Sequence, residues 1–166
     1  MPQLVDPADA LVQFQQAIAM DAIPLQPCEL DPSIVVCLDK PNGKVRFTHL
    51  DLDGRTVTAM VMLVAGEHRG GIPCFDIGYA VPKPFRGQGR AARLVAQAIR
   101  EMKHGLGRAE FETFYVEAVV GLDNAASQKV AAASLASKAV PTRDEYTELP
   151  ALQYSTKYET RRLSSV

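Results

Sequence analysis

The sequence predicts an α+β fold, in which helices pack on a mixed α/β sheet, and three observations lead to it. Short β-type runs separated by turn residues fill the first half of the chain, and a strand–helix–strand–helix pattern follows them. With 166 residues, of which 47% are apolar and 22% charged, the chain also has the size and composition of one globular domain. We therefore expect a single domain over residues 1–166.

The chain is expected to begin with a helix. Asp6 and Pro7 are typical of a helix start, and the pattern continues to about Met20. Pro24 and Pro27 then break it.

An antiparallel meander is predicted next. Its runs cover residues 34–38, 45–52, 56–65 and 74–81. The first three are separated by Pro41-Asn42-Gly43 and Asp53-Gly54, and Gly70-Gly71 lies before the fourth. Asn-Gly and Asp-Gly between such runs are strong hairpin signals.

The second half predicts a crossover and a final hairpin. An amphipathic helix follows Ala91 and is expected to stop at Gly105 and Gly107. Its predicted apolar stripe consists of Leu94, Val95, Ala98, Ile99 and Met102. A strand over 114–120 leads to a second helix from about Asn124, with Asp123 as its N-cap. Two strands, near 140–148 and 152–159, close the chain. One crossover then joins neighbouring parallel strands, which makes the sheet mixed.

Charge and cysteine usage limit the possible partners. The net charge of −1 gives no global field for nucleic acid or anionic membrane. The three cysteines have no metal-ligand spacing, so reduced thiols of a cytoplasmic protein are expected, with no metal. No signal peptide is recognisable, and no stretch approaches the roughly 20 apolar residues that span a bilayer. We expect no membrane association and no direct nucleic-acid binding.

The chemistry is expected at the loop over residues 86–91. Gly87 and Gly89 allow a ligand to approach the backbone, and the loop ends at a helix N-terminus, where free amides and the helix dipole attract anions. Arg86 and Arg90 add positive charge. Such a loop suits a pyrophosphate, although a glycine-rich turn without a ligand is the open alternative.

Other phosphate-binding loops fit this segment less well. A Walker loop ends in Gly-Lys-Ser/Thr, which is missing here. Residues 87–92 match the loose dinucleotide motif, but that motif should follow the first strand of a parallel repeat and precede a strand that ends in an acid. Neither condition holds. Nicotinamide binding therefore rests on the glycine pattern alone.

Three motifs then occur in a characteristic order. They are Asp76-Ile77-Gly78-Tyr79-Ala80-Val81, the loop with Arg86, Gly89 and Ala91, and Val116-Glu117-Ala118-Val119-Val120 followed by Asp123-Asn124-Ala125-Ala126-Ser127. Together they resemble the GNAT acetyltransferase superfamily, nearest the branch of ribosomal-protein N-terminal acetyltransferases. The last strand of that branch is similar to residues 151–158. The resemblance covers roughly residues 75–158.

The resemblance implies an acetyl-CoA-dependent N-acetyltransferase with a defined cofactor site. Loop amides would hold the pyrophosphate, main-chain groups near Tyr79 would pair with the pantetheine arm, and Asn124 and Ser127 would lie beside it. The implied cofactor-binding residues are Tyr79, Ala80, Val81, Arg86, Gly87, Gln88, Gly89, Arg90, Ala91, Asn124 and Ser127. The expected partners are acetyl-CoA and an amine acceptor, and a homodimer is left open.

Attack on a thioester requires an unprotonated amine, so a carboxylate is expected as the general base. Asp76 is the first candidate, because it occupies the acidic position of the family's strand motif, and Glu117 is the second. The alternative for Asp76 is a charge at the strand edge that faces water. The alternative for Glu117 is an ion pair with an arginine. Tyr79 or Ser127 could protonate the leaving thiolate. A strand amide near Val81 is the candidate oxyanion donor.

The chain departs from the family pattern at two places. Ala131 stands where many relatives carry a tyrosine as general acid, which leaves Ser127, Ser134 or water. Leu135-Ala136 replaces a Gly-Phe pair. The first departure motivates a second hypothesis, a sensor or interaction module that binds acetyl-CoA without turnover.

Overall fold

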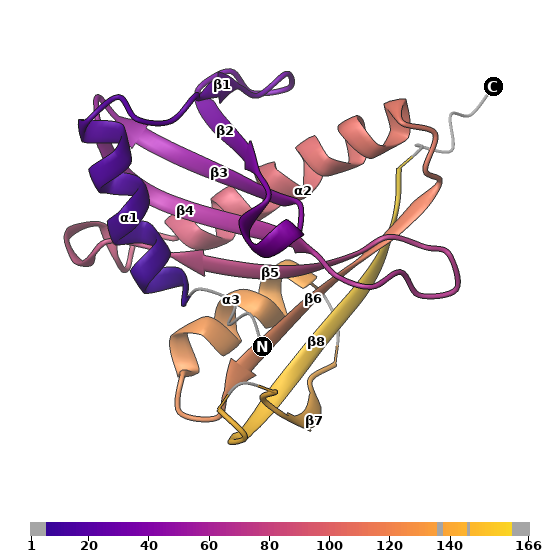
Figure 1. Cartoon of the computed structure of the whole chain (residues 1–166). Helices are drawn as coiled ribbons and strands as arrows, with labels where there is room; N and C mark the ends of the chain where they lie inside the picture. Colours follow the sequence, from indigo (N-terminus) through magenta and orange to yellow (C-terminus); the bar gives the residue numbers. More distant parts are fainter. Residues whose placement is uncertain (1–5, 136–137, 146, 161–166) are drawn as a thin grey trace.

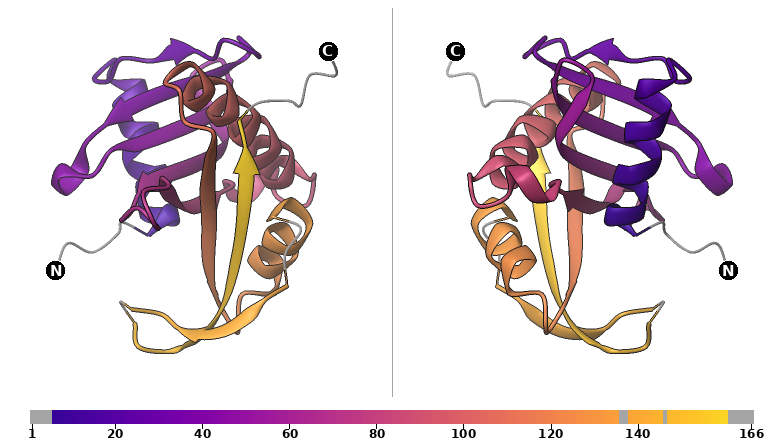
Figure 2. Two further views of the ribbon diagram at one scale, coloured as in Figure 1. Left: turned by 90° about the vertical axis from the view of Figure 1, so that its right-hand side faces the viewer. Right: turned by 90° about the vertical axis from the view of Figure 1, so that its left-hand side faces the viewer.

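The protein forms a single sheet with helices on both faces. The computed structural model describes residues 6–135, 138–145 and 147–160. One helix, α1, lies on one face of the sheet, while α2 and α3 lie on the other (Figures 1 and 2). This arrangement confirms the predicted α+β class with a mixed sheet.

The described residues form an eight-stranded sheet in the order β1-β2-β3-β4-β5-β6-β8-β7. Neighbouring strands are antiparallel except for β5 and β6, which run parallel across the crossover through α2. The strands are β1 (Gln26–Pro27), β2 (Ile34–Asp39), β3 (Arg46–Asp53), β4 (Thr56–Ala65), β5 (Cys74–Ala80), β6 (Thr113–Gly121), β7 (Val140–Arg143) and β8 (Pro150–Glu159). The helices are α1 (Pro7–Ala19), α2 (Arg90–Arg108) and α3 (Ala125–Leu135).

Helix α1 begins as expected, because the Asp6 carboxylate accepts a hydrogen bond of 2.8 Å from the Ala8 amide and Pro7 occupies the first turn. Its inner side packs on one face of the sheet, mainly against β4 and β5. The buried residues of this cluster are Ala10, Phe14, Ile18, Cys37, Leu50, Val57, Met60 and Met62, with Cys28 instead in the cluster on the other face.

Helix α2 supplies the core of the other face. All five residues of the predicted apolar stripe are buried: Leu94, Val95, Ala98, Ile99 and Met102. The predicted stop at Gly105 and Gly107 was wrong, because the helix continues through both to Arg108. It ends in a Schellman motif: Glu110 takes a φ of +68°, and the Phe111 amide donates to the Leu106 carbonyl at 3.0 Å. Leu106 packs against the main core, and this tertiary contact outweighs the low helix propensity of two glycines.

Two other local predictions need correction. The N-cap of α3 is Asn124 rather than Asp123, since the Asn124 side-chain oxygen accepts from the Ser127 amide at 3.1 Å. The strand expected over 140–148 ends at Arg143, where a turn begins: the Asp144 amide donates to Leu149 and the Glu148 amide to Asp144. The short strand β1 was not predicted. None of the helices in the described part of the chain has the length and apolar character to span a bilayer.

A histidine side chain lies in the core. His49, on β3, is 1% exposed, and its Nδ1 has no hydrogen-bond partner among the described residues. Burial disfavours the charged imidazolium and lowers the pKa of His49 to about 4. The folded protein therefore keeps this histidine neutral over a pH range in which the unfolded chain protonates it.

We predict that acid destabilises the protein through His49. Between pH 6.5 and 4 the unfolded state binds the extra proton, so the free energy of unfolding should fall as the pH falls. A folded pKa of about 4 against an ordinary 6.5 corresponds to a loss of about 3 kcal/mol at the lower limit. Denaturant unfolding at several pH values measures it. His49→Leu should flatten the pH dependence of the free energy of unfolding. The control His68→Leu, at an exposed hairpin tip, should leave it unchanged. The same pH dependence in both variants would contradict the assignment of this effect to His49.

Candidate functional site

The central feature of the sheet is a fork between the parallel strands β5 and β6. Their ladder comprises only Cys74 with Tyr115, Phe75 with Val116 and Asp76 with Glu117. Beyond this point β5 stays paired with β4 as far as Ala80, and β6 stays paired with β8 as far as Gly121. The two strands therefore diverge in a V that Figure 1 shows from the α1 side.

The fork leaves main-chain groups of β5 facing open space. The Pro73 carbonyl accepts from the Tyr115 amide at 2.8 Å, whereas the Cys74 carbonyl accepts from the Gly66 amide on the β4 side. The main-chain groups of successive residues point to opposite edges of a strand. Those of Cys74 point to β4, so those of Tyr79, five residues later, point to the opposite edge and into the gap between the diverging strands. An extended ligand in the gap could pair with these groups as an added strand would.

The loop over residues 86–91 follows β5 and is exposed. Gly87 and Gly89 have φ values of +76° and +70°, and a Cβ at either would meet nothing within 4 Å. Among the described residues, none accepts a hydrogen bond from the main-chain amides of residues 87–92, and Gly89 is the N-cap of α2. These amides and the positive end of the α2 dipole form a site suited to an anion.

The arginines of the loop are held by neighbouring groups. The Arg86 Nε donates to the Val81 carbonyl at 2.8 Å, and the Arg90 Nε donates to the Gln88 side chain at 3.0 Å. Arg86 thereby ties the loop to the end of β5. Arg90 also lies 5.2 Å from the centre of the Phe85 ring.

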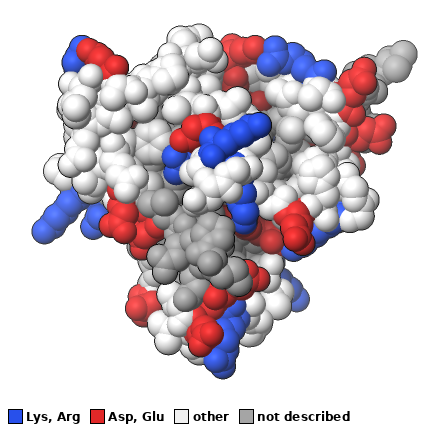
Figure 3. Space-filling view, viewed as in Figure 1, with Lys and Arg blue, Asp and Glu red and all other residues white. Residues whose placement is uncertain are grey.

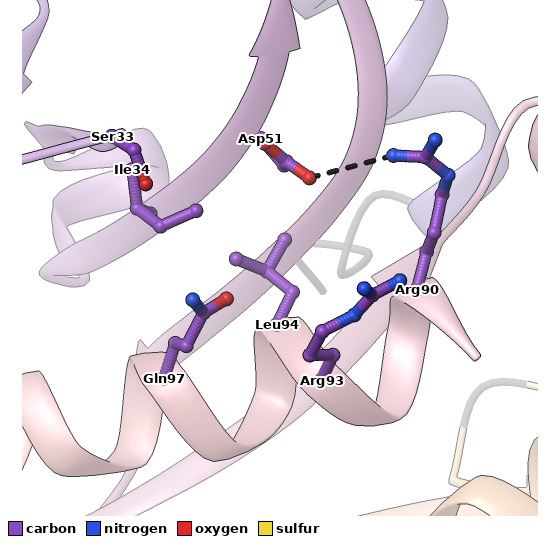
Figure 4. Close-up of a pocket in the computed structure, with 7 residues that line it drawn as sticks. All are labelled: Ser33, Ile34, Asp51, Arg90, Arg93, Leu94 and Gln97. Carbon is purple, nitrogen blue, oxygen red and sulfur yellow. Dashed lines mark ion pairs between the residues drawn. The ribbon is translucent and has the colours of Figure 1, made fainter. Parts of the chain in front are cut away.

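A polar hollow of about 210 Å³ lies on the side of α2 that faces β2 and β3 (Figure 4). Arg90 points across it toward Asp51, with a nitrogen–oxygen distance of 3.6 Å. The hollow shares Arg90 with the loop but contains no residue of the fork. Its lining consists of Ser33, Ile34, Asp51, Arg90, Arg93, Leu94 and Gln97.

A hydroxyl pair bridges the fork on the face of α3. The Tyr79 hydroxyl donates to the Ser127 carbonyl at 2.7 Å and accepts from the Ser127 hydroxyl at 2.9 Å. Burial raises the pKa of Tyr79, so its phenol keeps its proton. The sequence named both residues, and the structure brings them together.

A carboxylate pair lies at the vertex of the fork. Asp76 and Glu117 are partners in the last step of the ladder, so their side chains leave the sheet on the same face, the one that α1 covers in part. Burial raises the pKa of Asp76. No described side chain donates a hydrogen bond to Asp76, whereas Glu117 pairs with Arg69 and accepts from the Ser155 hydroxyl at 3.4 Å.

Arg69, Ser155 and Tyr115 surround this pair, and the sequence did not place them there. Arg69, at the tip of the hairpin between β4 and β5, contacts Glu117 and the Tyr115 ring. The alternative of an arginine partner for Glu117 is thus observed.

On the face shown in Figure 3, acidic and basic side chains are interspersed, so neither sign of charge dominates this face.

The two departures from the family pattern have structural counterparts. Ala131 is 1% exposed in the core, so α3 offers no acid at that position. Leu135 is buried in the same cluster, and Ala136 lies outside the described residues. The described residues contain no group of three or more His, Cys, Asp and Glu side chains placed to hold a metal ion.

Comparison with solved structures finds the same architecture in known acetyltransferases. A GNAT-family acetyltransferase from Streptococcus pneumoniae aligns with a TM-score of 0.52 and 12% identity over 94% of this chain and 98% of its own. The ribosomal-protein-S5-alanine acetyltransferase from Vibrio fischeri aligns with a TM-score of 0.52 and 15% identity over 93% and 90%. At these identities the likeness shows the fold.

A third structure, RimL, the ribosomal L7/L12 alpha-N-protein acetyltransferase in complex with coenzyme A, aligns with a TM-score of 0.51 and 17% identity. The alignment covers 70% of this chain and spans 64% of RimL. Among curated proteins, none matches this sequence.

The sequence profile described as the acetyltransferase (GNAT) family matches residues 14–135. This match includes α2, the fork and α3. Because it covers well over half of the sequence, the chain belongs to the acetyltransferase (GNAT) family, whose acyl donor is acetyl-CoA.

Proposed function

We propose that this protein transfers the acetyl group of acetyl-CoA to a primary amine, which is a protein N-terminus, a lysine side chain or a small amine. The observation that carries the proposal is the fork between β5 and β6. It joins an anion site on the α2 side to a carboxylate pair on the α1 side. Donor and acceptor can therefore approach the same gap from opposite faces of the sheet.

The residues of the loop fit the pyrophosphate of the donor. Free amides from Gly87 to Ala91 would bind it, and Arg86 and Arg90 would add positive charge. The main chain from Tyr79 to Val81 would pair with the pantetheine arm and direct its thioester into the fork. Asn124 caps α3 with its side-chain oxygen, which leaves its amide nitrogen to contact this arm.

The carboxylates would serve the acceptor. An ammonium group that reaches the vertex gives its proton to Asp76, and the free nitrogen then attacks the thioester carbon. Attack forms the carbon–nitrogen bond and a tetrahedral intermediate, whose collapse breaks the carbon–sulfur bond. The nitrogen loses a second proton as the amide forms, which balances the proton that the leaving thiolate gains. A main-chain amide near Val81 would stabilise the charge that develops on the carbonyl oxygen.

The leaving thiolate needs a proton, and the hydroxyl pair supports a source for it. Tyr79 is protonated and lies at the fork, and Ser127 can pass a proton along the existing hydrogen bond. This pair would replace the helix tyrosine that is absent at Ala131. A thiol has an ordinary pKa near 8.5, so the thiolate is a good leaving group and a weak general acid is sufficient to protonate it.

The second candidate function is binding of acetyl-CoA without turnover, and the buried Ala131 favours it. The two functions separate in an assay of thiol release with N-terminal peptides, lysine peptides and small amines. We expect release that depends on one class of amine. Tight binding of acetyl-CoA with no acetylated product from any acceptor would instead support the non-catalytic module.

We predict that Gly89→Asp weakens coenzyme A binding at least tenfold, because it brings a carboxylate and a strained backbone into the anion site. Isothermal titration calorimetry measures the affinity. Gly54→Asp is the matched control, since Gly54 has a φ of +58° with equally open surroundings but lies in the β3–β4 turn. Equal affinity in both variants would remove the loop from the site.

We predict that Asp76→Asn lowers kcat/KM for the amine about 100-fold, the contribution of a general base, and leaves the affinity for coenzyme A unchanged. The rate of the unmodified protein should fall toward acid as Asp76 gains its proton, and this decline should disappear in the variant. Asp53→Asn, at the exposed end of β3, is the control. An unchanged pH–rate profile would exclude Asp76 as the base.

A further inference from the structure

A short hairpin between β4 and β5 brings one arginine to the carboxylate pair. Its tip is Arg69-Gly70-Gly71-Ile72, in which Gly70 and Gly71 have φ values of +55° and +81°. The Arg69 amide donates to the Ile72 carbonyl at 2.9 Å, and the Ile72 amide returns the bond at 3.0 Å. Two positive φ values between such a pair are typical of a tight type I′ turn, so the backbone of Arg69 is well fixed.

The side chain of Arg69 follows the surface of β6. Its guanidinium lies 5.1 Å from the centre of the Tyr115 ring and forms an ion pair with Glu117. Tyr115 and Glu117 are two residues apart, so they lie on one face of the strand. The Arg69 side chain is 46% exposed and that of Glu117 only 12%, so a buried carboxylate meets a cation that solvent can reach.

Asp76 lies at the base of the same hairpin. A Cβ built on Gly66 would be 3.7 Å from the Asp76 Oδ2, so the carboxylate rests against the chain that leads to Arg69. The two carboxylates thus occupy equivalent positions on adjacent strands but have different partners. Glu117 forms an ion pair with Arg69 and accepts a hydrogen bond from the Ser155 hydroxyl, whereas Asp76 accepts no hydrogen bond from the described residues.

We propose that Arg69 is a positioning residue of the acceptor site: by pairing with Glu117 it cancels the charge beside Asp76 and leaves Asp76 as the carboxylate that takes the proton from the amine. This inference rests on the proposed function and assigns unequal roles to the two acids. Two unpaired carboxylates at adjacent positions would repel each other and hold one proton between them. The arginine removes that repulsion without occupying Asp76.

Other charged groups also face this place. Lys44, from the β2–β3 connection, and Arg69 lower the pKa of Asp76, while burial and Glu145, from the β7–β8 connection, raise it. Lys157 lies 5.9 Å from the centre of the Tyr115 ring. Of these cations, Arg69 pairs with Glu117. Its removal should therefore expose Asp76 to the full charge of Glu117.

The test compares Arg69→Met with Arg69→Lys, with Arg55→Met as the control. Arg55 lies in the β3–β4 turn, where it pairs with Asp21. Two quantities are measured for each protein: the titration of the Asp76 carboxyl carbon by NMR, with its signal assigned through Asp76→Asn, and the pH profile of kcat/KM. The NMR titration of Asp76 can be measured in a protein without enzymatic activity. It therefore tests the role of Arg69 independently of the proposed function.

We expect Arg69→Met to raise the pKa of Asp76 by about half to one unit, because a partly exposed cation contributes less than a buried one. The acid limb of kcat/KM should shift upward to match, which is a loss of about threefold to tenfold at acid pH that recovers at higher pH. Arg69→Lys should restore part of the shift, and Arg55→Met should change neither quantity.

Two results would overturn the inference. One is an Asp76 titration that is the same in Arg69→Met and the unmodified protein. The other is a loss of rate that is equal at every pH, which a purely structural role would give. A shifted titration in a protein that acetylates no amine would instead overturn the proposed function while the coupling of the two acids stands.

Discussion

Two strands that separate within a sheet must leave main-chain donors and acceptors without partners, and the site of this protein depends on that constraint. The β5–β6 ladder stops at Asp76 and Glu117, while β4 and β8 keep the outer edges of the two strands paired. The unpaired groups are therefore confined to the inside of the V. A ligand with amide groups can satisfy them, which supports the proposal that a pantetheine arm lies in the gap.

The helices give the two faces of this gap different chemistry. On one face α2 begins at the glycine loop and α3 contributes Ser127, so main-chain amides and hydroxyls prevail. On the other face α1 covers β3 to β5 only in part, and the β7–β8 turn projects to the same side (Figure 2). Asp76 and Glu117 lie there, with Arg69 paired to Glu117. Free main-chain amides and a carboxylate pair thus lie on opposite faces of one opening.

Much of the fold followed from local patterns, and the errors arose where packing decides. The apolar stripe of α2 and the turns of the meander are short-range signals, and both were predicted correctly. The end of α2 was wrong because the core contact of Leu106 overrides Gly105 and Gly107. Asp123 and Asn124 are both good caps, so sequence alone could not choose between them. The contact of Arg69 with Glu117 joins distant parts of the chain, and no periodicity reports it.

The bond between Tyr79 and Ser127 has a mechanical consequence. It connects β5 to the helix that follows β6, so the open end of the V is braced by a phenol ring while its vertex is held by the ladder. These two hydrogen bonds oppose a widening of the V at its open end, so a molecule that enters must fit beside the Tyr79 ring.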